Sequence, residues 1–330
     1  MTTPAISVLR EAFPQSIISY IVEKPYRRLV EGNSNLDRVF VVEKKQSLKD
    51  LARLIREIRK DKYDAVLDFH GGPRAFLLVL FSKAKLKIGY KIKYKSFIYD
   101  LKLPRSRENG YIHSVENHIN LVQALGIEVG KFPPLHLPQA QKKEVEKVKK
   151  FREENNLESS KVVVLHISAG NEFRNWGVDN IVELIGLLAQ IPGIKIVLIG
   201  SEEDKKAEEE ILRKSSFPLP SLVGKINLME LKELIAHASL FVGPDSGPMH
   251  VAASTSTPIV AYFGPTLPAH FAPWQAKANL LEKEFDCRPC KQQRCFYQDF
   301  RCLRSIKPEE VYKASLEFLG RFEPCNLQKS

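Results

Sequence analysis

The chain is organised around Leu240-Phe-Val-Gly-Pro-Asp-Ser-Gly-Pro-Met-His-Val-Ala-Ala-Ser254, followed by Pro258-Ile-Val-Ala-Tyr-Phe-Gly-Pro-Thr266. The apolar residues of this stretch predict two short buried strands, over residues 240–242 and 259–263. Between them, residues 245–247 predict a turn, and Pro248 suits the first turn of a helix. A strand, a small-residue turn and a helix start direct free backbone N–H groups at one point, which suits a phosphate group.

His250 follows Ser246 by four residues, which is about one helical turn. We therefore expect the imidazole to return to the mouth of the turn, with Ser246 or Gly247 as the helix cap. The same spacing also fits an ordinary capped strand–turn–helix unit with a core-facing histidine. The stretch alone leaves both interpretations open.

Composition describes a folded protein of ordinary polarity. The chain has 330 residues, of which 44% are hydrophobic and 27% are charged, and this length predicts two domains. Fifty basic against 39 acidic residues give a net charge of +11, which indicates an anionic partner. The longest apolar run, Phe76–Phe81, is too short to span a bilayer, and no signal segment follows Met1. We expect a cytoplasmic protein with reduced cysteines.

Strands alternate with helices along both halves, which predicts an α/β fold of two doubly wound domains with parallel sheets. The expected N-terminal domain spans residues 1–135, a linker and charged helix span 136–160, and the C-terminal domain spans 161–330. In the N-terminal half we expect strands over residues 17–22, 39–42, 65–69 and 86–89, and helices over 4–13, 25–31, 48–59, 74–81 and 113–125. In the C-terminal half we expect further strands over 161–167, 194–200 and 219–223, and helices over 178–190, 204–214, 228–237 and 308–319.

Three further loops follow predicted strands: Ser168-Ala-Gly-Asn-Glu-Phe-Arg-Asn-Trp176, Gly200-Ser-Glu202 and Gly224-Lys-Ile-Asn-Leu228. Neither G-x-G-x-x-G nor a Walker A sequence is present, which disfavours a dinucleotide cofactor and an NTPase. Together with Gly243–His250, Phe263–Thr266, Gly71 and Arg74, these loops resemble glycosyltransferase family 9, the ADP-heptose:lipopolysaccharide heptosyltransferases. The resemblance covers nearly the whole chain.

The resemblance implies the GT-B arrangement, two Rossmann-like domains with a cleft between them. The N-terminal domain would receive a phosphorylated, lipid-linked acceptor, and the C-terminal domain would hold the nucleotide-sugar donor. The implied reaction transfers heptose from ADP-heptose to a lipopolysaccharide inner-core acceptor with inversion, and it requires no cofactor. We expect a monomer that binds no nucleic acid.

The same resemblance implies donor-binding roles for nine residues of the C-terminal half. Arg174 would contact the diphosphate, since its fork of donors matches phosphate geometry. Glu202 would accept hydrogen bonds from the ribose, and Ile226 would contact the adenine. The residues implied at the phosphates and the sugar are Ser168, Ala169, Asp245, Ser246, Gly247 and His250.

Family members begin with a strand and a Gly-Asp loop before the Thr2-Thr-Pro4 found here, and that Asp is the proposed general base. We therefore expect Met1 to be an internal start, with strands 17–22 and 65–69 left with a gap or paired directly. An alternative function is a non-catalytic or impaired nucleotide-sugar-binding remnant, and a GT-B epimerase is a third. Asp68 and His70 are the substitute catalytic candidates, although Asp68 more often has a structural role at such a position.

Residues 83–107 contain nine basic side chains and one acid, with Tyr90, Tyr94, Phe97 and Tyr99 among them. This pattern predicts contact with a phosphorylated lipid or the anionic inner-membrane surface, so the protein would be peripheral on its cytoplasmic face. A solvated loop is the alternative. No nucleic-acid-binding motif accompanies the segment.

Four of the five cysteines, Cys287, Cys290, Cys295 and Cys302, lie within sixteen residues. Four thiolates at this spacing could hold zinc or an iron–sulfur cluster. The spacing matches no standard finger or ferredoxin pattern, so a metal-free cysteine loop is the alternative.

Overall fold

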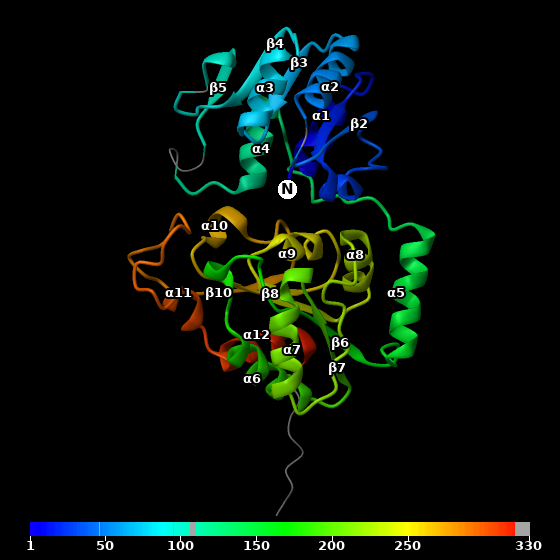
Figure 1. Ribbon diagram of the computed structural model, residues 1–330, viewed down its shortest axis with the longest axis vertical. Coiled ribbons are helices and arrows are strands. Elements are labelled where there is room, and N and C mark those ends of the chain that lie inside the picture. The colour runs from blue at the N-terminus through cyan, green and yellow to red at the C-terminus, as the bar shows by residue number, and fades with distance from the viewer. Residues whose placement is uncertain (46, 95, 106–109, 321–330) are drawn as a thin grey trace, which may run out of the picture. The chain divides into compact units, whose positions relative to one another are not determined.

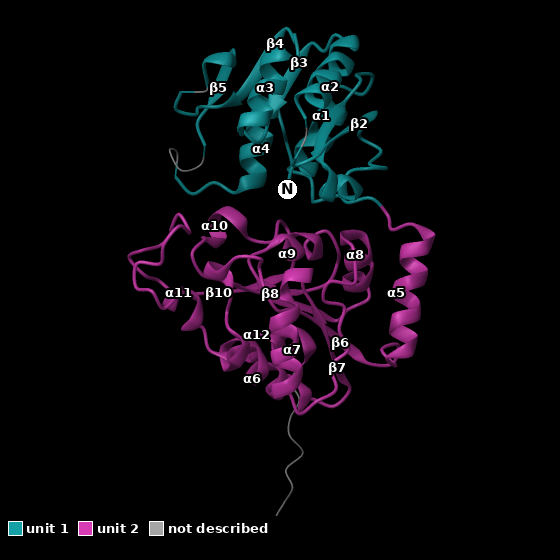
Figure 2. Ribbon diagram, in the orientation of Figure 1, with its two compact units in different colours: residues 1–138 teal, residues 139–330 magenta. Residues whose placement is uncertain are grey.

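A computed structural model describes residues 1–330 except 46, 95, 106–109 and 321–330 (Figure 1). The chain divides into two compact units, residues 1–138 and 139–330 (Figure 2). Every strand pair among the described residues is parallel, and helices separate the strands along the sequence, as predicted for an α/β fold. None of the described helices is both long and apolar enough to cross a membrane.

Unit 1 contains eleven described elements. They are α1 (Thr3–Ala12), β1 (Ser19–Glu23), η1 (Lys24–Leu29), β2 (Arg38–Val42), α2 (Leu48–Lys60), β3 (Ala65–Asp68), α3 (Pro73–Phe81), β4 (Leu86–Tyr90), η2 (Ser96–Ile98), β5 (Leu101–Leu103) and α4 (Ser114–Gln123). The strands form two sheets, β1-β2 and β3-β4-β5. Strands β1 and β3 do not pair. Of the two arrangements expected from the sequence, a gap or direct pairing, the structure has the gap.

Helices α2 and α3 join the two sheets of unit 1. Helix α2 begins at a cap in which the Ser47 side chain accepts a hydrogen bond from the Asp50 N–H, and its apolar face carries Leu54 and Ile58. These side chains pack with Val42 of β2 and Leu78 of α3 in one buried cluster. Val79 of α3 packs in a second cluster with Val66 of β3. Burial in these two clusters therefore links the two sheets through α3, although no described strand pairing joins them.

Unit 2 begins with the charged helix α5 (Lys142–Glu154), which packs on α8. The other elements are β6 (Lys161–His166), η3 (Glu172–Arg174), α6 (Val178–Ala189), β7 (Ile194–Ile199), η4 (Glu202–Asp204), α7 (Lys205–Lys214), α8 (Leu228–Ala236), β8 (Leu240–Pro244), α9 (Gly247–Ala252), β9 (Ile259–Phe263), α10 (Pro268–Phe271), β10 (Ala278–Glu282), α11 (Arg301–Arg304) and α12 (Pro308–Leu319). The strands form one five-stranded sheet in the order β10-β9-β8-β6-β7.

Helices cover both faces of the unit 2 sheet. Helices α6 and α12 pack against each other and on the strands, while α8 and α9 lie on the other side (Figure 1). Continuous apolar runs make this possible, since β6, β8 and β9 are buried almost throughout. The fold class predicted from the sequence is confirmed by this doubly wound arrangement.

Several predicted elements differ from the structure. Strand β8 continues through Gly243 and Pro244, because Pro244 needs no N–H to pair with Tyr262 at the strand end. Residues 219–223 form a single bridge between Ser221 and Leu198 instead of a strand, in a segment where Pro218 and Pro220 lack donors. Residues 24–29 form a 3₁₀ helix.

Candidate functional site

The unit 2 sheet has a topological switch point at β6. Strands β7 and β8 lie on opposite sides of β6, and ligands of open α/β sheets bind outside the carboxyl ends of strands at such a point. The loops that begin there are residues 167–177 after β6 and residues 245–246 after β8. These are two of the loops that the sequence assigned to the donor.

His166 and Ser246 connect the two loops at the switch point. The His166 Nδ1 lies 3.1 Å from the Ser246 Oγ, in a buried contact. Burial lowers the pKa of His166 to about 4, so the imidazole is neutral at pH 7. Glycine at 243 permits this approach, because a Cβ there would lie 2.8 Å from the His166 Cβ. Ser246, one of the two predicted cap residues, is the N-cap residue of α9, although its side chain makes no cap hydrogen bond.

Asp245 is held by two partners. The Thr266 hydroxyl donates to the Asp245 Oδ2 at 2.6 Å, and the Arg174 Nη1 donates to the Asp245 backbone oxygen at 3.2 Å and lies 3.6 Å from Oδ2. Burial raises the pKa of Asp245, while Thr266 and Arg174 act in the opposite direction. Asp245 therefore helps to orient the Arg174 guanidinium through its backbone oxygen and its nearby carboxylate.

Arg174 ends the short η3 helix, which is fixed on both sides. The Asn171 side chain accepts a hydrogen bond from the Phe173 N–H at 2.9 Å and caps the helix start. After the helix, Trp176 is buried, with its Nε1 donating to the Ile306 oxygen at 2.8 Å and its ring 4.7 Å from that of Tyr262. The Arg174 side chain between these anchors keeps 29% of its surface exposed, so solvent and ligands can reach it.

Glu202 and Ile226 lie in two neighbouring loops beside β7. Gly224 has a φ of +67°, and a Cβ there would lie 2.3 Å from the Glu202 Oε2, so only glycine allows the loops to approach this closely. The Glu202 carboxylate also pairs with the Lys205 ammonium. Ile226 is half-buried. The loops that carry the residues expected at the ribose and the adenine thus lie side by side.

The remaining donor candidates occupy the same strand ends. The Ser168 Oγ accepts a hydrogen bond from the Gly170 N–H at 3.2 Å, while Ala169 is half-buried. Gly247 is exposed at the start of α9, and His250 is half-buried one turn later. Contacts therefore link Arg174 to Asp245 and Ser246 to His166, and the donor-binding roles of all these residues stay predictions.

In unit 1, Asp68 is engaged in local structure. Its carboxylate accepts hydrogen bonds from the N–H groups of His70 at 2.9 Å and Gly71 at 2.8 Å, and from the Tyr99 hydroxyl at 2.6 Å. Burial, followed by the interaction with Asp68, raises the pKa of Tyr99. These bonds fit the structural role expected for Asp68. His70 is exposed, and its proposed part in acceptor binding stays a prediction.

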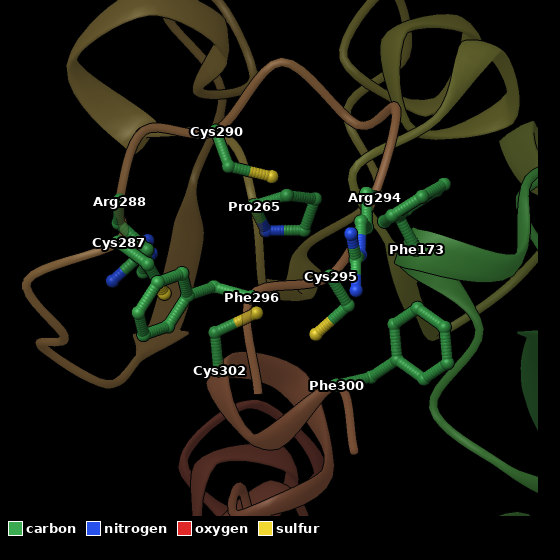
Figure 3. Close-up of a pocket in the computed structure, with 10 residues that line it drawn as sticks. All are labelled: Phe173, Pro265, Cys287, Arg288, Cys290, Arg294, Cys295, Phe296, Phe300 and Cys302. Atoms are coloured by element: carbon green, nitrogen blue, oxygen red, sulfur yellow. The ribbon is translucent and has the colours of Figure 1, made fainter. Parts of the chain in front are cut away.

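The four cysteines line one pocket of about 110 Å³, together with Phe173, Pro265 and Phe300 (Figure 3). All four are free thiols. Burial, followed by the neighbouring cysteines, raises the pKa of Cys302 to about 11, so it is protonated at neutral pH. Within the described chain, no three His, Cys, Asp or Glu side chains are arranged to hold a metal ion.

The family model for glycosyltransferase family 9 (heptosyltransferase) matches residues 51–300 of this chain. The chain belongs to this family. Lipopolysaccharide heptosyltransferase 3 of Escherichia coli K12 is 28% identical over 285 residues, which cover 83% of this chain and 81% of that protein. Lipooligosaccharide heptosyltransferase 2 of Campylobacter jejuni is 30% identical over 162 residues, which cover 47% of this chain and 51% of that protein.

Solved structures of the family share the fold. A family 9 glycosyltransferase from Veillonella parvula superposes with a TM-score of 0.84 at 25% identity and covers 96% of this chain and 92% of its own. E. coli ADP-heptose lipopolysaccharide heptosyltransferase II has a TM-score of 0.74 at 22% identity, with 96% and 94% covered. The predicted family, the two-domain α/β fold and the glycosyltransferase class are confirmed.

Four residues of the site had no role predicted from the sequence. They are His166, Asn171, Thr266 and Gln292. A polar residue at the end of a buried strand is a signal that would identify His166. No local pattern marks Gln292, which lies in the cysteine segment far along the chain.

Proposed function

We propose that this chain is an inverting glycosyltransferase that transfers heptose from ADP-heptose to a lipopolysaccharide inner-core acceptor. The observation that carries the proposal is the contact of Arg174 with Asp245 at the switch point of the unit 2 sheet, next to Ser246, whose hydroxyl contacts His166. An arginine fork there binds a diphosphate and neutralises charge on the departing ADP. A relative named as a lipopolysaccharide heptosyltransferase, matched over 81% of its length, supports heptose as the sugar.

With its diphosphate at Arg174, the donor would lie across the carboxyl ends of the unit 2 strands. Glu202 accepts hydrogen bonds from the ribose hydroxyls, and Ile226 covers one face of the adenine. Ser168, Ala169, Gly247 and His250 surround the phosphates and the sugar. The close approach of Gly224 to Glu202 supports this order, because it brings the loop that carries Ile226 next to the loop that carries the carboxylate.

Titration calorimetry with ADP, ADP-heptose and UDP-sugars tests the donor assignment. We expect binding of both adenine nucleotides and heptose transfer to a deacylated inner-core acceptor. Binding of UDP-sugars without ADP-sugars would refute the donor assignment. Product formed from the nucleotide sugar without any acceptor would indicate an epimerase instead.

The second candidate function is binding of the nucleotide sugar with little or no transfer. The bonds of Asp68 favour it, since this buried carboxylate is already occupied by Tyr99 and two backbone donors. A missing general base lowers rates by roughly 10²–10⁴-fold. Donor binding by the wild-type protein with no acceptor-dependent transfer would support this alternative, and acceptor-dependent transfer by the wild-type protein would exclude it.

We also propose that unit 1 binds an anionic membrane at the cytoplasmic face through a basic–aromatic surface. We define this surface as the exposed lysine and aromatic residues of the 83–107 segment: Lys83, Lys85, Lys91, Lys93, Tyr94, Phe97 and Lys102. Tyr94 is 84% exposed and Phe97 is 72% exposed, which is unusual for aromatic side chains. Lysines attract anionic headgroups while aromatic rings enter the interface. Lys95 and residues 106–109 lie outside the described residues.

Co-sedimentation with phosphatidylglycerol vesicles tests the basic–aromatic surface. We expect binding that falls with salt and that Phe97→Ser weakens, while Tyr26→Ser, an exposed aromatic elsewhere in unit 1, does not. Preference for single-stranded nucleic acid over vesicles would contradict the proposal.

A zinc or iron–sulfur centre at Cys287, Cys290, Cys295 and Cys302 stays a prediction. Among the described residues, no three His, Cys, Asp or Glu side chains are placed to hold a metal ion. Elemental analysis of the purified protein decides it. A metal content near one per chain, lost in Cys295→Ser, would establish the centre, and metal-free protein with an unchanged melting temperature would exclude it.

A further inference from the structure

We infer that Gln292, in the cysteine loop of residues 287–302, positions Arg174, so that this loop forms part of the donor site. The inference rests on the proposed function only in that Arg174 meets the donor diphosphate. The positioning contact itself is independent of any ligand.

A single oxygen of Gln292 fixes both ends of η3. The Gln292 Oε1 accepts a hydrogen bond from the Arg174 Nε at 3.0 Å and another from the Asn171 Nδ2 at 3.0 Å. The other end of the Asn171 amide caps η3 through the Phe173 N–H. Gln292 therefore contacts the residue that starts the short helix and the residue that ends it.

These contacts fix the plane of the guanidinium group. Its Nε is bound to Gln292, and its Nη1 is bound to the Asp245 backbone oxygen at 3.2 Å. Among the described residues, Nη2 has no hydrogen-bonding partner in the protein, which leaves this donor to a ligand. A long side chain that is already ordered loses less conformational entropy when it binds a phosphate.

The cysteine loop is itself anchored to the segment that holds Asp245. The Arg288 side chain, only 3% exposed, donates to the Thr266 backbone oxygen at 2.9 Å, and the Cys290 N–H donates to the Pro265 oxygen at 3.0 Å. The Thr266 hydroxyl holds the Asp245 carboxylate. One short segment thus supports both partners of Arg174.

Further contacts join the loop to η3 around the cysteine pocket. The rings of Phe173 and Phe300 meet edge to face with their centroids 5.5 Å apart, at the side of the pocket that Figure 3 shows beside Cys295. The Gln292 N–H donates to the Cys290 Sγ at 3.4 Å. The cysteine loop therefore contacts η3 through Phe300 and contacts its own Cys290 through the Gln292 backbone. Both contacts restrict the position of Gln292.

Calorimetry with ADP tests the role of Gln292 through matched variants. Gln292→Met keeps the length and removes the acceptor, and Gln293→Met makes the same change at the exposed neighbouring position. We expect Gln292→Met to weaken ADP binding about tenfold, the effect of one lost hydrogen bond to a charged group. Gln293→Met should bind ADP as wild type does. In an Arg174→Ala background, Gln292→Met should cause no further loss, because its effect passes through Arg174.

A second readout needs no ligand. The Arg174 Nε–H signal, assigned in NMR spectra by its loss in Arg174→Lys, should exchange slowly with water in wild type and rapidly in Gln292→Met. Gln292→Glu retains an acceptor, so it should keep the signal protected while its added negative charge weakens ADP binding. This split separates positioning from a merely structural effect, and Gln292→Glu also serves if Gln292→Met does not fold.

The two readouts separate the inference from the proposed function. Wild-type protein that does not bind ADP would refute the donor assignment, and the exchange of the Arg174 Nε–H would still test the contact. Equal exchange rates and equal ADP affinities in Gln292→Met and Gln293→Met would overturn the inference. An additive loss in the Arg174→Ala background would overturn it as well.

Discussion

Replacement of Arg174 by alanine gives the most direct measure of the donor site. The wild-type guanidinium is oriented by Gln292 and Asp245 and is partly exposed toward solvent. Loss of a hydrogen bond to a charged group costs about 1.5–3 kcal/mol, which corresponds to a roughly 10- to 150-fold rise in the Kd for ADP. Arg174→Lys should retain part of the affinity, because it keeps the charge but loses the fork.

The matched control for this change is Arg213→Ala. Arg213 is exposed on α7 in the same unit, so its removal changes the net charge equally without touching the strand ends. Isothermal titration calorimetry of ADP at fixed ionic strength compares the two variants, and thermal melting verifies that both are folded. An ADP affinity in Arg174→Ala that equals that of Arg213→Ala would refute the assignment of Arg174 to the diphosphate.

Three further predictions concern stability and charge. Trp176→Ala should lower the free energy of unfolding by about 3–5 kcal/mol in guanidinium titrations, because it empties a buried site packed on Tyr262, whereas the exposed Phe296→Ala should have little effect. Burial lowers the pKa of His118 to about 3 and of His166 to about 4, so below about pH 6.5 the unfolded chain binds more protons than the folded chain. The melting temperature should therefore be highest above about pH 6.5 and fall as the pH drops toward 4. His118→Asn should flatten this dependence. Burial raises the pKa of Asp245, so Asp245→Asn should melt no lower than wild type at neutral pH yet bind ADP more weakly, and a lower melting temperature would contradict this.

Most of the fold could be predicted because its elements have strong local signals. Buried runs such as Lys161–His166 and the amphipathic helix Leu48–Lys60 define their own period and length. The short strands β5 and β10 have no such signal, since each gains its pairing from a neighbour distant in sequence. Residues 219–223 show the opposite error, because a strand was predicted where only one bridge forms. The prolines in this segment lack the backbone N–H donors that a longer strand would need.

In the candidate site, too, some residues could be predicted from the sequence and others could not, for a physical reason. Asp245 and Ser246 directly follow β8, and Arg174 lies in the loop after β6, so their position in the sequence indicates which edge of the sheet they reach. Gln292 reaches Arg174 across 118 residues, from a loop without regular structure, so no spacing within the sequence encodes the contact. The side chains proposed to bind the donor could therefore be placed at one edge of the sheet from the order of strands and turns, while their individual roles rest on the family resemblance and stay predictions. Those that hold the binding side chains in place depend on where loops return, and only the folded structure determines this.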